Sequence, residues 1–186
     1  MQRIRLVLAS ASPRRAELLT AAGFEFDVDP VHIDESRQEG ETPAVYVERV
    51  ARLKAGAGAA RHPTRVVIGA DTAVVLENDV LGKPRDEADA RDMLRRLSGR
   101  SHEVMTAVAV ASPGGIRTHV ERTTVWVRRL SEAEIASYAA SGEPMDRAGG
   151  YAIQGLAARF IPRIDGSYSN VVGLPLAALA DLIGAS

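Results

Sequence analysis

Hydrophobic residues recur along the chain with two different spacings, which together predict a mixture of strands and helices. Short apolar runs bounded by turn residues are typical of strands, and apolar positions three and four residues apart are typical of helices. The predicted strands cover residues 3–10, 24–31 and 65–76, and two long strands lie within 102–130. The predicted helices begin near residues 13, 43, 86 and 131, and a closing helix covers 174–183.

Several of these helices have residues at their ends that fix where they start and stop. Ser12 can cap the first helix with Pro13 at its first position, and Gly23 ends it. Ser131 and Glu134 form the sequence pattern of a capping box. Because strands and helices mix without a strict β-α-β order, we expect an α/β fold around a long mixed central sheet flanked by helices.

Composition restricts the class of protein further. A chain of 186 residues with 46% hydrophobic residues is expected to form a single domain over residues 1–186. A net charge of −1 and an aromatic content of 4% argue against a nucleic-acid-binding protein. The absence of cysteine excludes disulfides and thiolate metal sites. The apolar run near the start is too short for a signal peptide or membrane span, so we expect a cytoplasmic protein without a membrane partner.

Asp71 interrupts the apolar run VVIGADTAVV. A buried carboxylate is unfavourable unless it is paired, hydrogen-bonded or bound to a metal ion. Asp71 is therefore a candidate for binding metal or activating water. The alternative is a structural aspartate whose oxygens accept hydrogen bonds from backbone amides.

Only two of the 23 basic residues are lysines, and both stand in positions that suggest a role. Lys54 lies on the same helical stripe as Val47 and Val50, which predicts that its ammonium points toward the core. Lys83 precedes Pro84 and is therefore held on an extended connection before a helix. The alternatives are a Lys54 stem that reaches back to the surface and an ordinary surface position for Lys83.

The stretch LASASPRR predicts an anion site at a helix start, built from free backbone amides, the hydroxyls of Ser10 and Ser12, and the guanidinium groups of Arg14 and Arg15. It lacks both the Walker pattern and the dinucleotide-binding glycines. No G-x-S-x-G motif supports a serine hydrolase, and the four histidines are scattered. Glu35 follows Asp34 in a polar loop. If the two face Asp71, the carboxylates could hold Mg²⁺, although such loop residues are usually only solvated.

The motifs, taken in order, resemble those of the Maf family of nucleoside triphosphate pyrophosphatases. The matching segments cover almost the whole chain: LASASPRRAELL, DE at 34–35, ARLKA, GADTAVVL, GKPRDEADARDMLRRLSGRSHEVMTAVAV, DRAGGYAIQG and IDGSYSNVVGLPL. The resemblance implies a fold similar to that of the inosine triphosphate pyrophosphatases, with a deep cleft. It also implies hydrolysis between the α and β phosphates of a nucleoside triphosphate, with Mg²⁺ or Mn²⁺ as the divalent cofactor.

The same resemblance implies roles for individual residues. Asp71 would accept a proton from water, and Glu35 would help to hold the metal ion together with Asp71. The residues expected to line the phosphates are Ser10, Arg15, Lys54, Lys83 and Arg147. Position 147 is commonly lysine in the family, and the arginine here would bind phosphate as a planar fork.

Three positions are expected to choose the base: Arg14, Thr72 and Gln154. This set resembles the branch that acts on dTTP and UTP, whereas the branch acting on 7-methyl-GTP has Trp, Gln and Glu there. A glutamine amide can accept the N3–H of uracil and donate to a ring carbonyl. Similar proteins are often homodimers. The alternative function is a nucleotide-binding regulator of cell division or septation with incidental turnover.

Overall fold

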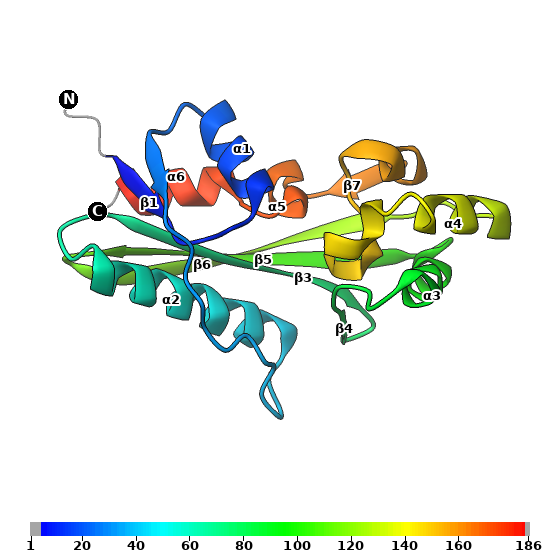
Figure 1. Cartoon of the computed structure of the whole chain (residues 1–186), viewed down its shortest axis with the longest axis horizontal. Coiled ribbons are helices and arrows are strands. Elements are labelled where there is room, and N and C mark those ends of the chain that lie inside the picture. Colours follow the sequence, from blue (N-terminus) through cyan, green and yellow to red (C-terminus); the bar gives the residue numbers. More distant parts are fainter. Residues whose placement is uncertain (1–4, 185–186) are drawn as a thin grey trace. The chain divides into compact units, whose positions relative to one another are not determined.

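Seven strands form one mixed sheet in the computed structural model, which describes residues 5–184 (Figure 1). The strands follow the order β2-β1-β3-β5-β6-β7, with β4 paired to β3. Strand β1 is parallel to both β2 and β3, whereas the β3–β4 and β6–β7 pairs are antiparallel. The strands are β1 (Leu6–Leu8), β2 (Phe26–Val28), β3 (Val67–Leu76), β4 (Asp79–Leu81), β5 (Ser101–Ser112), β6 (Gly115–Trp126) and β7 (Arg163–Asp165).

Six α-helices and three short 3-10 helices complete the described chain. The α-helices are α1 (Pro13–Ala21), α2 (Pro43–Arg61), α3 (Glu87–Leu97), α4 (Glu132–Ala139), α5 (Tyr168–Val172) and α6 (Leu176–Gly184). The 3-10 helices are η1 (Glu143–Asp146), η2 (Ala148–Gly150) and η3 (Gly155–Phe160). None of the helices within residues 5–184 is both long and apolar enough to cross a membrane.

The α/β fold with a mixed sheet and flanking helices is confirmed. Each predicted strand is present. Strands β1 and β2 are shorter than predicted, β3 begins two residues later, and β5 begins one residue earlier. The first two residues of the strand expected over 3–10 lie outside the described residues. Strands β4 and β7, helix α5 and the 3-10 helices were not predicted, because segments of three to six residues are too short to show a period. The deep cleft and the single domain over 1–186 stay predictions.

The helix ends agree with their sequence signals, with one difference. Ser12 is the N-cap of α1 and Pro13 its first residue, but the Ser12 side chain makes no capping hydrogen bond. Instead, the Ser12 amide donates to Oγ of Ser10 at 3.3 Å. Gly23 has a φ of +77°, which a glycine adopts without strain after a helix. The capping box of Ser131 and Glu134 is present at the start of α4.

The described chain falls into two compact units, and strands β3, β5 and β6 contribute residues to both. The first unit contains the chain up to Asp71, then Thr106–Glu121, and the C-terminal part from Gly173. The second unit contains Thr72–Met105 and Arg122–Val172.

In the first unit, α2 covers one face of the sheet and α1 and α6 cover the other (Figure 1). Alternation along β3 assigns its residues to these two faces. Ile68 and Ala70 belong to the apolar cluster that contains Leu19 of α1 and Leu179 of α6. Gly69, between them, faces α2, because a Cβ added there would lie 2.4 Å from the carbonyl oxygen of Ala51. Asp71 is two residues further along and therefore also faces α2.

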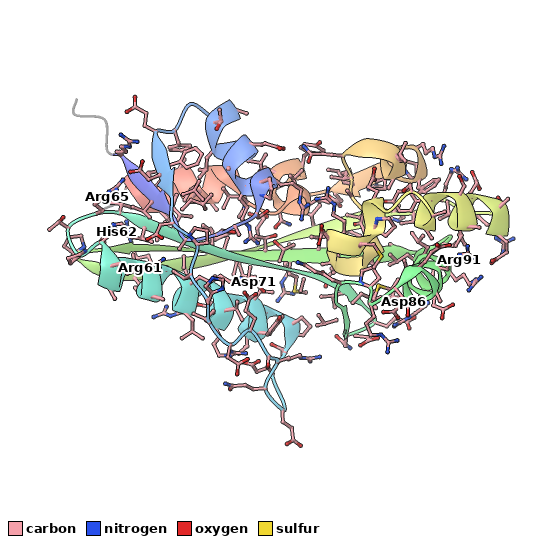
Figure 2. The ribbon with its side chains drawn as sticks, viewed as in Figure 1. Arg61, His62, Arg65, Asp71, Asp86 and Arg91 are labelled. Atoms are coloured by element: carbon pink, nitrogen blue, oxygen red, sulfur yellow. The ribbon has the colours of Figure 1, made fainter. Side chains whose placement is uncertain are left out.

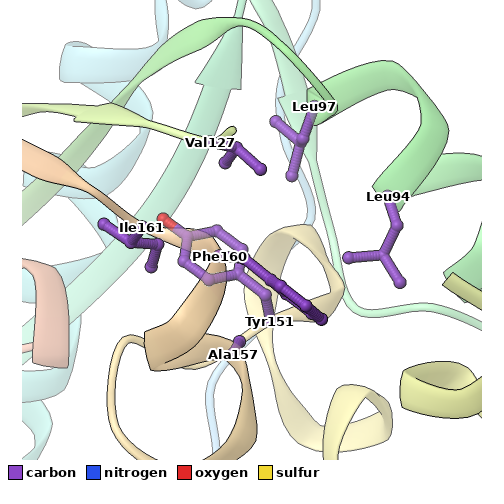
Figure 3. Close-up of a pocket in the computed structure, with 7 residues that line it drawn as sticks. All are labelled: Leu94, Leu97, Val127, Tyr151, Ala157, Phe160 and Ile161. Atoms are coloured by element: carbon purple, nitrogen blue, oxygen red, sulfur yellow. The ribbon is translucent and has the colours of Figure 1, made fainter. Parts of the chain in front are cut away.

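In the second unit, helices α3 and α4 and the 3-10 helices pack around a separate apolar core. This core holds a small cavity of about 10 Å³ (Figure 3). Its lining residues are Leu94, Leu97, Val127, Tyr151, Ala157, Phe160 and Ile161. A cavity this small and apolar is at the lower limit for a single water molecule, so we regard it as a packing defect and not a binding site.

Candidate active site

Lys54 joins two carboxylates in the first unit. Its Nζ donates to Oδ1 of Asp71 at 3.0 Å and to Oε2 of Glu35 at 2.8 Å. The side chains of Lys54 and Asp71 are 9% and 10% exposed, whereas that of Glu35 is 48% exposed. A buried ion pair therefore has one further carboxylate on its solvent side. The prediction that Lys54 points inward is confirmed, and Glu35 lies beside Asp71. Asp34 instead accepts from the amide of Ser36.

The packing of α2 on β3 explains how Lys54 reaches Asp71. Lys54 is buried on the same stripe of α2 as Val47, Val50 and Ala51. Because Gly69 has no side chain, the backbone of α2 at Ala51 approaches β3 closely. Figure 2 shows Asp71 beside α2, away from the end of the helix where Arg61 and His62 lie. The close approach holds the ammonium against the strand residue that faces it.

Burial raises the pKa of Asp71, and this effect exceeds the opposing effects of its cationic neighbours Lys54 and Arg15. Glu35 adds to the rise by like-charge repulsion. A carboxyl group with a raised pKa is a stronger base once it is ionised, which suits proton transfer from water. Perturbed pKa values of this kind are typical of functional sites, although structural ion pairs also produce them.

Ser10 and Arg15 form a second buried group at the start of α1. Nη1 of Arg15 donates to Oγ of Ser10 at 3.0 Å, and its Nε donates to the carbonyl oxygen of Gly173 at 2.9 Å. Burial lowers the pKa of Arg15, and the charges of Asp71 and Glu35 counteract the shift. The charge of Arg15 therefore interacts with Asp71 and Glu35, the two carboxylates that Lys54 contacts. Arg14 is half-buried in the first turn of α1.

A salt bridge that was not predicted from the sequence fixes the loop that carries Glu35. Arg49 of α2 contacts both carboxylate oxygens of Glu41, at 2.5 and 2.9 Å. Its Nη2 also donates to the carbonyl oxygen of Ser36, the residue after Glu35, at 2.8 Å. The pair holds the pKa of Glu41 at about 2, through its hydrogen bonds with Arg49 above all. We call the contacts of Arg49 with Glu41 and Ser36 the loop clamp.

Tyr46 was also missed. It is half-buried on α2, and its pKa is raised by burial first and then by the charges of Asp71 and Glu35. The guanidinium of Arg49 lies 5.9 Å from the centre of the Tyr46 ring. The signal available in the sequence was the spacing of Tyr46 and Arg49, three residues apart and hence neighbours on one side of the helix.

The remaining candidate residues belong to the second unit. Thr72 is half-buried and follows Asp71 directly on β3, and Lys83 and Gln154 are exposed. The amide of Gly149 donates to the carbonyl oxygen of Gly82 at 2.9 Å, which brings the segment after Arg147 beside the segment of Lys83. Nε and Nη1 of Arg147 are buried and make no hydrogen bond within residues 5–184. Unsatisfied buried donors are rare and costly, which makes this guanidinium a candidate ligand for an anion.

The donor set of the first unit is compatible with a magnesium or manganese ion that arrives with a phosphate ligand. Within residues 5–184, no three His, Cys, Asp or Glu side chains gather into a metal-binding group. Glu35 and Asp71 nevertheless place two carboxylates around one point, the Lys54 ammonium. Mg²⁺ in proteins is commonly held by one or two carboxylates, with water and substrate phosphates as its other ligands. Two carboxylates are thus sufficient for a substrate-bound metal.

Comparison with known proteins finds relatives that match most of the chain. The chain is 52% identical over 177 residues to the dTTP/UTP pyrophosphatase of Aliivibrio fischeri, covering 92% of this chain and 93% of that protein. It is 55% identical over 173 residues to the protein of the same name from Vibrio cholerae, covering 92% of each chain. The corresponding protein of Geobacter sulfurreducens is 53% identical over 183 residues, with 97% and 96% covered.

Solved structures show the same fold at much lower identity. The Staphylococcus aureus Ham1 protein matches with a TM-score of 0.55 at 16% identity, covering 98% of this chain and 100% of that one. The HAM1 protein from Coxiella burnetii matches with a TM-score of 0.54 at 17% identity and the same coverage. The family model described as Maf-like protein matches residues 5–186. The chain therefore belongs to the Maf family.

Proposed function

We propose that this protein is a nucleoside triphosphate pyrophosphatase that hydrolyses dTTP and UTP to the monophosphate and pyrophosphate. The observation that carries the proposal is the buried pair of Lys54 and Asp71 with Glu35 on its solvent side. Relatives about 52% identical over most of the chain bear the name dTTP/UTP pyrophosphatase. Both the chemistry of the cluster and the names of the relatives support the same reaction.

In this proposal Asp71 accepts a proton from the water that attacks the α phosphorus. Lys54 binds Oδ1 of Asp71, so Oδ2 is the oxygen that takes the proton. The bond from the α phosphorus to the bridging oxygen breaks, and pyrophosphate leaves with the electron pair. The positive charges of Arg15, Lys54 and Lys83 offset the charge that builds on the leaving group. Arg147 adds a further guanidinium whose buried donors have no partner within the described chain.

A divalent cation is part of the proposal, and Glu35 and Asp71 are the residues that would hold it. When bound, such an ion supplies charge neutralisation at the phosphates and lowers the pKa of water. The four charged groups Arg15, Glu35, Lys54 and Asp71 have no net formal charge. These four residues therefore offer little net attraction to a polyanionic triphosphate, and a cation that enters with the phosphates adds positive charge beside them.

Base selection is proposed for Arg14, Thr72 and Gln154. Gln154 is exposed at the start of η3, and its side chain makes no capping hydrogen bond to that helix. Its amide therefore has both a donor and an acceptor to offer to the edge of uracil or thymine.

The direct test is a panel of purified nucleoside triphosphates with Mg²⁺ or Mn²⁺, analysed for monophosphate, pyrophosphate and orthophosphate. We expect UTP and dTTP to give monophosphate and pyrophosphate in equal amounts. Orthophosphate as the first product would overturn cleavage between the α and β phosphates. Binding of nucleotide with negligible turnover, and no loss in Asp71→Asn, would instead favour the regulator of cell division or septation.

A further inference from the structure

Glu143 holds the backbone on the C-terminal side of Gln154. Its Oε2 accepts from the amide of Leu156 at 3.0 Å, and its Oε1 accepts from the amide of Ala157 at 3.4 Å. These are the second and third amides of η3, where a carboxylate is stabilised by the unpaired N–H groups of the helix start. Glu143 lies in η1 and reaches across the chain to this turn.

Tyr138 holds the backbone on the other side of Gln154. Its hydroxyl donates to Oε1 of Glu143 at 2.9 Å and accepts from the amide of Ala152 at 3.3 Å. The Tyr138 ring is fully buried and packs edge-on against Phe160, with ring centres 5.5 Å apart. Burial and the hydrogen bond to Glu143 raise the pKa of Tyr138, so the hydroxyl remains a donor at neutral pH.

Gly155 completes the arrangement. Its φ is +84°, and a Cβ at this position would lie 2.6 Å from Oε2 of Glu143. The residue after Gln154 must therefore be glycine for the carboxylate to reach the amides behind it. One anchored amide before Gln154 and two after it leave the backbone of residues 153–155 little freedom.

We propose that Glu143, with Tyr138, is a positioning residue that fixes Gln154 for reading the base. The inference rests on the proposed role of Gln154 and deepens it. A glutamine on a loose turn can rotate its amide and its backbone to suit either uracil or cytosine. An anchored turn fixes the position of the Gln154 Cα and the direction of its Cα–Cβ bond, so fewer side-chain rotamers bring the amide to the base, and the preference for uracil then depends on the anchors.

The experiment measures kcat/KM for UTP and for CTP, which differ at N3 and at the group on C4. The variants are Glu143→Gln, Gln154→Ala and the double variant, with Glu132→Gln as the matched control. Glu132 is an exposed carboxylate of the same unit that pairs with Arg95 and does not touch the Gln154 turn. We expect Glu143→Gln to lower the UTP to CTP ratio by about three- to tenfold, the effect of a weakened hydrogen bond. The control ratio should be unchanged.

The double variant separates positioning from a general loss of structure. If Glu143 acts through Gln154, adding Glu143→Gln to Gln154→Ala should not lower the ratio further. An equal loss in both backgrounds, or no loss in Glu143→Gln alone, would overturn the inference and leave the base-reading role of Gln154 intact. An unchanged ratio in Gln154→Ala would overturn that role itself, and this inference with it.

Should Glu143→Gln fail to fold, Tyr138→Phe provides the same test, because it removes only the hydroxyl and keeps the buried ring. It should lower the UTP to CTP ratio in the wild-type background and not in the Gln154→Ala background. Hydrogen exchange of the Ala152 amide, which the hydroxyl binds, should be faster in this variant. Unchanged exchange together with an unchanged ratio would overturn the inference.

Discussion

The ammonium of Lys54 lies 3.0 Å from Oδ1 of Asp71, inside the packed layer between helix α2 and strand β3. Both groups are removed from water, and the shift in the pKa of Asp71 shows that burial outweighs the attraction of the neighbouring cations. A buried pair of this kind adds little stability of its own, because the cost of removing both charges from water offsets their attraction. Neutralising Asp71 should therefore change activity and stability in opposite directions.

Asp71→Asn should strongly lower turnover while raising thermal stability at neutral pH. The folded-state pKa of Asp71 lies above its unfolded value, so the folded protein loses stability as pH rises through this interval. Asparagine has the shape of the neutral carboxyl and avoids that cost. We expect kcat to fall by about 10²–10⁴-fold, as for loss of a general base. Melting curves at pH 4 and pH 8 should show the gain in stability only at the higher pH. A lower melting temperature at pH 8 would contradict it.

Lys54→Met should move the acidic limb of the pH profile of kcat/KM to higher pH. Lys54 lowers the pKa of Asp71, so removing its charge leaves burial less opposed. The comparison is Arg52→Met, an exposed cation two residues earlier on α2. An acidic limb that stays in place in Lys54→Met would mean that a group other than Asp71 controls it.

Arg49→Met should weaken metal binding through the loop clamp. Without Arg49, the loop at Ser36 loses its attachment to α2 and Glu35 is no longer held beside Asp71. Mutation of residues that support metal ligands typically lowers metal affinity by about 10- to 100-fold. We expect Arg49→Met to lower it by about tenfold. Mn²⁺ binding in the presence of a non-hydrolysable triphosphate, followed by electron paramagnetic resonance, measures it directly. Glu35→Gln should show a larger loss and Arg52→Met none.

Gly69→Ala should destabilise the protein and reduce its activity together. The new methyl group would meet the backbone of Ala51 and Ala55 at 2.4 and 2.5 Å, so α2 must move away from β3. Overpacking of this kind costs about 1–3 kcal/mol. Gly56→Ala is the matched control, because its Cβ would meet only a side-chain atom at 3.5 Å. As a glycine inside α2, it should gain up to about 1 kcal/mol on substitution. Denaturant titration compares the two.

Gln154→Glu should shift preference from UTP toward 7-methyl-GTP. A glutamate offers only acceptors, which suit the donors on the guanine edge, whereas glutamine offers both a donor and an acceptor. The ratio of kcat/KM for the two nucleotides is the measurement. If that ratio is unchanged, Gln154 does not read the base.

The central pair was predictable from the sequence because charges inside apolar patterns stand out. Asp71 breaks a strand of hydrophobic residues and Lys54 lies on a buried helical stripe, so each was a candidate before the structure placed them together. Glu41 and Glu143 gave no such signal. They lie in polar segments that resemble ordinary surface loops, and their partners are 8 and up to 14 residues away. Contacts made by loop residues leave no periodic pattern in the sequence from which they could be predicted.

Prediction of the fold has the same limit, because only elements long enough to show a periodic pattern were recognised. Strands β3, β5 and β6 were recognised because ten or twelve residues carry a clear pattern. Strand β7 and helix α5 have three and five residues. Whether such short segments form a strand or a helix depends on the elements they pack against and not on local sequence preference. The homodimer, the cytoplasmic location and the bound metal stay predictions.

The boundary between the two compact units passes through the peptide bond that joins Asp71 to Thr72. Asp71, with its partners Lys54 and Glu35, belongs to one unit, whereas Thr72 and Gln154 belong to the other. Of the positions proposed to choose the base, Arg14 alone shares the unit of Asp71. A protein engineer can therefore randomise positions around Thr72 and Gln154 to search for new substrates without touching Asp71, Lys54 or Glu35, provided that Lys83 and Arg147 of the second unit are kept. Substitutions around Thr72 and Gln154 are also the changes by which evolution can alter the substrate range of such a chain.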